Sequence, residues 1–204
     1  MGNLQFISEF FYRSFSFGKS GRGGVVPVLI CLLLCLMLPQ TGLAIQDSLF
    51  NSEEIFRIKL SGEIEELLRD RTGDPEYTPV ELSYIDTKGT EIKIPLKVRQ
   101  RGNFRRIKSN CKYPPLLLNF AKKNTPKTIF DGQDKIKLVM PCKDDKYVLQ
   151  EYYAYKIYNL VTPRSFRVRL VEVVLDDPAL KEKESSPFYG FLLEEEEQLA
   201  ERNN

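Results

Sequence analysis

Residues 80–98 read VELSYIDTKGTEIKIPLKV and form the clearest hairpin pattern of the chain. Apolar side chains alternate with polar ones on both sides of the turn, at Val80, Leu82, Tyr84, Ile92, Ile94, Leu96 and Val98. A period of two predicts strands with one buried face, and Asp86-Thr87-Lys88-Gly89 is typical of a hairpin turn. Because Pro95 has no N–H, we expect a sheet edge or a bulge there. The hairpin therefore predicts an antiparallel sheet.

The segments around the hairpin extend this sheet. Strand patterns occur at residues 56–60, 114–120, 136–140, 168–174 and 188–193. Between Tyr147 and Pro163 the apolar residues recur at three- and four-residue steps, which predicts a helix of about four turns. A shorter helix begins at Glu194. The order of elements predicts an α+β fold, with a mainly antiparallel sheet and one long packed helix.

The first 44 residues have the pattern of a secretory signal peptide. Basic residues precede an apolar run at residues 25–38, which is shorter than the ~20 residues needed to span a bilayer. Gly42 and Ala44 place small side chains before a cleavage site at Ile45. The alternatives are an uncleaved signal anchor and a lipoprotein signal at Cys35.

Export divides the chain into a signal peptide, residues 1–44, and one domain, residues 45–204. We expect a secreted or periplasmic protein that contacts the membrane only through the signal segment during export. The last predicted helix has barely begun before the sequence ends, so we expect the domain to be incomplete at its C-terminus.

Charge and residue types exclude several classes of function. The chain has 30 basic and 28 acidic residues, and the excess of +2 lies in the signal segment, so the mature domain is neutral. A neutral domain lacks the basic footprint of a nucleic-acid-binding protein. The chain also has no histidine, which excludes Ser-His-Asp and Cys-His catalysis and histidine-ligated zinc.

Two of the four cysteines, Cys111 and Cys142, remain after removal of the signal segment. Their spacing does not match a zinc site. An even pair in an oxidising compartment favours one disulfide over two free thiols.

Four charged features are candidates for a binding site. Arg101-Gly102-Asn103 lies in a basic run whose arginine forks suit phosphate oxygens, or else it is a solvated hairpin end. Lys112 enters a strand and could pair with Glu151 on the long helix, or both side chains are solvated. The acids at residues 194–197 open the last helix, where they would complement its dipole.

The order of these features resembles the front half of the spore-coat protein H (CotH) kinase family, over residues 56–204. Arg101-Gly102-Asn103 and the segment from Tyr189-Gly190 to Glu195 carry the resemblance, which is nearest to exported bacterial members of unassigned function. One departure is that Phe104 and Arg105 stand where the family usually has serines.

The resemblance implies the small lobe of an atypical protein-kinase-like fold, with ATP and Mg²⁺ as cofactors. It implies a nucleotide-binding set formed by Arg101, Gly102, Asn103, Lys112, Glu151, Glu194 and Glu195. The catalytic aspartate and the metal ligands of such kinases belong to the second lobe, so we expect neither catalytic nor metal-binding residues within this chain.

Two functions follow from these observations. The chain is either the nucleotide-binding lobe of an exported phosphotransferase that lacks its catalytic second lobe, or a non-catalytic exported module with a binding or structural role. The partner of such a module is a protein or a small ligand of unassigned identity.

Overall fold

A computed structural model describes residues 49–71, 73–179 and 184–204. The predicted signal peptide and its cleavage site lie outside the described residues. The described residues belong to one compact unit. None of the helices in the described ranges is long and apolar enough to cross a membrane.

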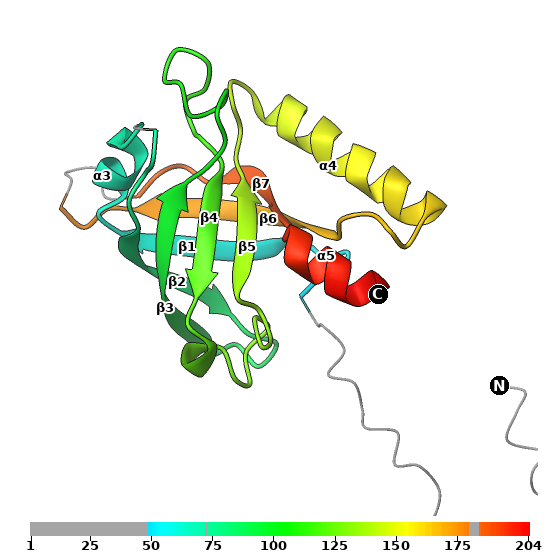
Figure 1. Ribbon diagram of the computed structural model, residues 1–204. Helices are drawn as coiled ribbons and strands as arrows, with labels where there is room; N and C mark the ends of the chain where they lie inside the picture. Colours follow the sequence, from blue (N-terminus) through cyan, green and yellow to red (C-terminus); the bar gives the residue numbers. More distant parts are fainter. Residues whose placement is uncertain (1–48, 72, 180–183) are drawn as a thin grey trace, which may run out of the picture. The chain divides into compact units, whose positions relative to one another are not determined.

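Seven strands form the body of the domain (Figure 1). They are β1 (Phe56–Gly62), β2 (Thr78–Ile85), β3 (Glu91–Gln100), β4 (Leu116–Phe120), β5 (Lys135–Val139), β6 (Val168–Asp176) and β7 (Phe188–Leu193). Their order in the sheet is β1-β2-β3-β4-β5-β7-β6, and the sheet closes into a barrel. The predicted hairpin is present as β2 and β3, in which Tyr84 pairs with Ile92.

The predicted fold class is wrong because the sheet closes on itself. Strand β1 pairs antiparallel with β2 on one side and parallel with β6 on the other, where Phe56 lies opposite Val171. This single parallel pairing turns an open antiparallel sheet into a mixed, closed barrel. The domain is therefore mainly sheet, and it is not the α+β small lobe of a kinase-like fold. Periodicity identifies strands, but it carries no information on which distant strands pair.

The helices lie outside the barrel (Figure 1). They are α3 (Ile64–Arg69), α4 (Asp145–Val161) and α5 (Glu196–Asn203), with a 3-10 turn η1 (Lys122–Asn124). Helix α4 starts where the Asp144 side chain accepts a hydrogen bond from the backbone of Lys146, and it ends before Pro163. It packs on the outer surface of β6 and β7. The predicted long helix thus exists, but it covers one wall of a barrel.

Two apolar clusters hold these layers together. The larger cluster fills the barrel and includes the aromatic rings of Phe56, Tyr84, Phe120 and Phe130. The smaller cluster lies between α4 and the outer wall, and its members are Val139, Val148, Tyr152, Val168, Phe191 and Leu193. The alternation of inward and outward residues on β5, β6 and β7 supplies both clusters.

The predicted disulfide is confirmed. Cys111, in the loop between β3 and β4, is bonded to Cys142, which precedes α4. The backbone N–H of Lys112 also donates to the carbonyl of Cys142 at 2.9 Å. The disulfide therefore fastens the β3–β4 loop to the start of the long helix.

Candidate functional site

The structure places Arg101-Gly102-Asn103 at the start of the loop between β3 and β4. The backbone of Gly102 has φ 79°, in the left-handed region that favours glycine. The N–H of Arg101 donates to the carbonyl of Pro115 at 2.9 Å, while Gly102 and Asn103 are exposed. Glycine is therefore needed here for the shape of the loop.

Lys112 and Glu151 do not form the predicted pair. The Glu151 carboxylate accepts a 2.6 Å hydrogen bond from Nη2 of Arg105, so it connects α4 to the β3–β4 loop. The ammonium of Lys112 instead lies 4.9 Å from the centre of the Tyr113 ring. Sequence reasoning missed Arg105 as the partner because it is 46 residues from Glu151, and no local pattern links the two.

Glu194 is fully buried and serves the packing of α5. Its carboxylate accepts hydrogen bonds from the backbone and Nε of Arg167, and from Nε and Nη2 of Arg202, at 2.9–3.1 Å. Burial by itself raises the pKa of Glu194, but the hydrogen bonds from Arg202 and Arg167 outweigh it and hold the pKa below its usual value. Arg167 and Arg202 are the cations beside Glu194, and both are bound to its carboxylate, so they are not available to a ligand.

Glu195 belongs to a neighbouring charge cluster that the sequence did not reveal. Lys137, buried on the outer face of β5, lies 3.7 Å from Glu195 and 2.5 Å from Glu196. Burial raises the pKa of Glu195, whereas its hydrogen bond to Glu196 lowers the pKa of Glu196 to about 2. The cluster neutralises Lys137 at the first turn of α5.

A cavity of about 820 Å³ opens at the end of the barrel where the β2–β3 turn lies. Its lining comes from the start of β1, the β2–β3 turn, the loop after η1 and the start of β6; the residues are Glu54–Arg57, Tyr84–Lys88, Ile92, Lys127, Ile129 and Arg169. This cavity lies at the opposite end of β3 from Arg101-Gly102-Asn103. It contains none of the residues that the resemblance implied.

Arg169 is a charged residue inside the barrel. It pairs across the sheet with Leu192, which belongs to the interior cluster, so both side chains point inward. Only 6% of Arg169 is exposed. Its Nη1 donates to the carbonyl of Leu49 at 2.9 Å, while Nε is buried without a hydrogen-bond partner. Within the described ranges no carboxylate forms an ion pair with it, and burial lowers its pKa.

The guanidinium of Arg169 lies over an aromatic ring, which in turn packs against a second ring. Its central carbon lies 4.7 Å from the centre of the Phe56 ring, which contacts Tyr84 edge-to-face at 5.2 Å. The hydroxyl oxygen of Tyr84 accepts a hydrogen bond from the N–H of Ile129 at 3.2 Å. Tyr84 thereby connects the cavity wall to the loop that follows η1, and its O–H remains able to donate.

The rim of the cavity carries a strained residue. Lys127 has φ 63°, a conformation that side chains other than glycine adopt rarely. Its N–H donates to the carboxylate of Asp131 at 3.2 Å, which helps to hold the loop. Residues in such conformations cluster at ligand sites, where the surrounding structure maintains them.

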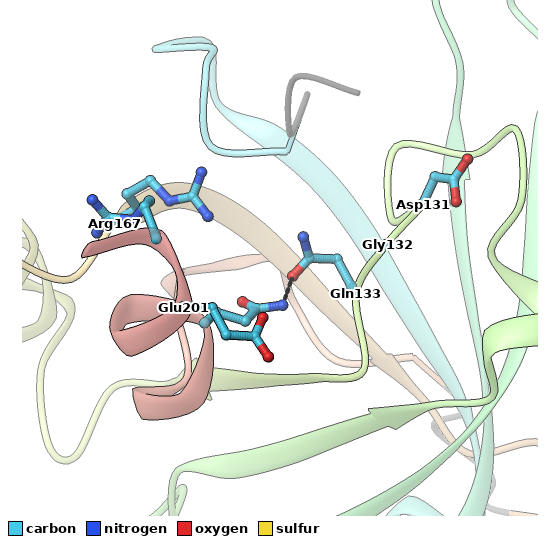
Figure 2. Close-up of a pocket in the computed structure, with 7 residues that line it drawn as sticks. Asp131, Gly132, Gln133, Arg167 and Glu201 are labelled. Carbon is cyan, nitrogen blue, oxygen red and sulfur yellow. Dashed lines mark hydrogen bonds between the residues drawn. The ribbon is translucent and has the colours of Figure 1, made fainter. Parts of the chain in front are cut away.

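A second cavity of about 370 Å³ lies beside α5 (Figure 2). Its walls include Gln133 and Gln198, which are joined by a 2.9 Å hydrogen bond, the dashed line in the figure. Arg167 and Arg202 also line it, but both bind Glu194. We consider the barrel cavity the better candidate because Arg169 in its lining forms no ion pair with a described carboxylate, whereas the second arginine of the lining, Arg57, binds Glu172.

Sequence reasoning missed Arg169, although a signal was present. Val171, Val173 and Leu175 are in phase with it along β6, and all three are buried. An arginine in phase with an inward row of apolar residues indicates a buried cation, which needs a partner or a ligand. The apolar periodicity alone predicts only a buried strand and takes no account of this charge.

No group of three or more potential metal ligands gathers within the described parts of the chain. Comparison with protein-family models found no match, and no curated protein sequence and no solved structure matches the chain.

Proposed function

We propose that this chain is an exported, non-catalytic binding module that takes a small organic anion into the barrel cavity. The observation that carries the proposal is Arg169, an inward-pointing arginine that is 6% exposed, lines the cavity and has an unpartnered Nε. The charge of Glu54, on the same cavity wall, acts on Arg169, but no described carboxylate forms an ion pair with it. A buried charge without an ion-pair partner is costly, so such a site favours an occupant of opposite charge.

The cavity also indicates what the rest of the ligand resembles. Phe56, Tyr84, Ile92 and Ile129 give apolar surface close to the guanidinium. Ligand sites commonly combine mostly apolar walls with a few fixed polar groups that orient the ligand. We therefore infer a carboxylate or sulfonate attached to an aromatic or aliphatic body, with the anionic group at Arg169.

Nucleotide binding is not part of this proposal. Nucleotide binding was implied by a kinase-like small lobe. The strands form a closed barrel instead, so the fold no longer supports that function. Arg105 and Glu151, beside the predicted nucleotide-binding loop, already neutralise each other.

The experiment uses 8-anilinonaphthalene-1-sulfonate, an aromatic anion whose fluorescence rises in apolar cavities. We expect saturable binding with one site per chain. Arg169→Met should weaken it by about 10- to 100-fold, because charge-assisted hydrogen bonds contribute about 1.5–3 kcal/mol. Arg69→Met, on the exposed surface of α3, is the matched control and should bind as the unchanged protein does.

A second variant keeps the test valid if Arg169→Met does not fold. Ile92→Trp leaves the arginine in place and adds bulk to a partly buried cavity wall. It should reduce binding while the far-ultraviolet circular dichroism stays unchanged. Equal binding by the Arg169→Met, Ile92→Trp and control proteins would overturn the proposal.

A further inference from the structure

The loop between β3 and β4 combines positive charge with exposed apolar side chains. Residues 99–112 contain six Lys or Arg and no Asp or Glu. In the same loop, Phe104 is 70% exposed and Ile107 is 52% exposed. Figure 1 shows this loop projecting from the barrel beside the start of α4.

The two apolar side chains come from the first and last positions of a tight turn. The N–H of Ile107 donates to the carbonyl of Phe104 at 3.3 Å, and the side-chain amide of Asn110 donates to the same carbonyl at 3.0 Å. A bond between residues three apart brings the ends of a turn close together. Phe104 and Ile107 therefore lie at the two ends of one turn with their side chains exposed, and we call this pair the apolar tip.

Hydrogen bonds and the disulfide fasten the loop that carries the tip to the rest of the domain. Nη1 and Nη2 of Arg71 donate to the carbonyls of Arg106 and Lys112 at 3.0 and 2.9 Å. The Cys111–Cys142 disulfide fixes the far end of the loop. These contacts restrain the backbone of the loop, which lowers the conformational entropy that binding through the tip would cost.

Four of the six cations of this loop form no ion pair with any described residue. Arg99 and Arg105 pair with Asp74 and Glu151. The unpaired ones are Arg101, Arg106, Lys108 and Lys112. The start of α4, which the disulfide attaches to this loop, adds exposed Lys143 and Lys146, beside Asp144 and half-buried Asp145. Those two lysines and two aspartates cancel in charge, so the excess of positive charge belongs to the loop itself, in which the apolar tip also lies.

We propose that this loop docks the domain onto an anionic lipid surface, with Phe104 and Ile107 in the interfacial layer and the cations at the headgroups. A loop that combines exposed apolar side chains with several Lys and Arg residues has the composition of a peripheral membrane-binding segment. A lipid surface requires no shape complementarity, which suits a protruding tip better than a flat protein interface. The docking is independent of the barrel cavity and goes beyond the sequence expectation that only the signal segment meets a membrane.

Vesicle flotation tests this with the exported, processed protein. The vesicles contain phosphatidylcholine alone or phosphatidylcholine mixed with phosphatidylglycerol. We expect binding to the anionic vesicles only, and weakening at high salt because screening reduces the attraction. Equal binding to both kinds of vesicle, or to neither, would refute the proposal.

Paired variants distinguish vesicle binding through the tip from nonspecific hydrophobic adsorption. Phe104→Ser combined with Ile107→Ser should weaken vesicle binding by about tenfold or more, since two apolar side chains no longer leave water. The control is Leu160→Ser, on α4, where the side chain is 88% exposed and far in sequence from the loop. Lys108→Glu should also weaken binding, whereas Lys123→Glu, in η1 of the β4–β5 loop, should not.

Two further results decide between lipid and other occupants. If inorganic phosphate displaces the vesicles and the double serine variant binds them normally, the loop is a phosphate site and the proposal fails. Arg169→Met, which empties the barrel site of its cation, should leave vesicle binding unchanged. The two sites can therefore fail separately.

Discussion

Single ionisable residues in this domain are placed by their partners rather than by their neighbours in sequence. Glu194 follows strand β7 in a run of four glutamates, a position typical of acids that complement a helix dipole. Its carboxylate is instead enclosed by Arg167 and Arg202, and Nη1 and Nη2 of Arg202 also donate to the carbonyls of Pro163 and Ser165. This network fixes α5 to the segment before β6.

The low pKa of Glu194 predicts an acid-sensitive domain. The arginine hydrogen bonds depress the folded-state pKa below the usual value of about 4.3. The network therefore contributes stability above pH 4.3 that is lost as pH falls through the folded pKa. Thermal unfolding from pH 7 to pH 3 should show the melting temperature falling below pH 4.3.

Glu194→Gln provides the matched test of that acid sensitivity. Removing one partner of a buried ion pair costs about 3–5 kcal/mol, so the variant should melt much earlier at pH 7 and show a weaker pH dependence. Glu197→Gln, exposed on the first turn of α5, should keep both the stability and the pH profile. Identical profiles for the two variants would contradict the role given to Glu194.

At the scale of elements, local patterns were sufficient to place the strands and the long helix. The alternation around Val80–Val98 predicted β2 and β3, and the three- and four-residue steps after Tyr147 predicted α4. These patterns are local because each element must present one apolar face. These patterns could not show how closely two elements approach each other, and Gly190 is an example.

Gly190 permits β7 to approach β5 closely. A Cβ at this position would lie 2.7 Å from the backbone carbonyl oxygen of Val139, closer than atoms can pack. Gly190→Ala must therefore displace a strand, and we expect a loss of about 1–3 kcal/mol of unfolding free energy. Urea unfolding measures this, with Gly73→Ala as the control because no atom would lie within 4 Å of its Cβ. Equal stability of both variants would show that the strands move apart without cost.

At the scale of the whole molecule, closure of the barrel was beyond the reach of the sequence. The ion pair between Arg57 and Glu172 joins β1 to β6 across 115 residues, and no local pattern specifies such a partner. The same limit applied to the candidate site. Arg169 becomes a cavity residue only after Phe56 and the β2–β3 turn are brought to it by closure.

The disulfide acts at this scale because it closes a large loop. Cys111 and Cys142 are 31 residues apart, and constraining such a loop in the unfolded chain contributes roughly 3–4 kcal/mol. Reduction should lower the urea midpoint accordingly. Thiol labelling of the denatured, unreduced protein should leave Cys111 and Cys142 unlabelled; labelling of both would contradict the pairing.

The parallel pairing of β1 with β6 also determines when this chain can finish folding. The first strand is synthesised early, but its second neighbour ends at Asp176, so the barrel stays open until most of the domain exists. Contacts between such distant segments slow folding, because the chain loses the entropy of closing the long intervening loop before the contacts stabilise it. Until then β1 and β6 have unpaired edges that can join other chains. A chaperone that covers β1 during this interval would keep its unpaired edge from joining another chain.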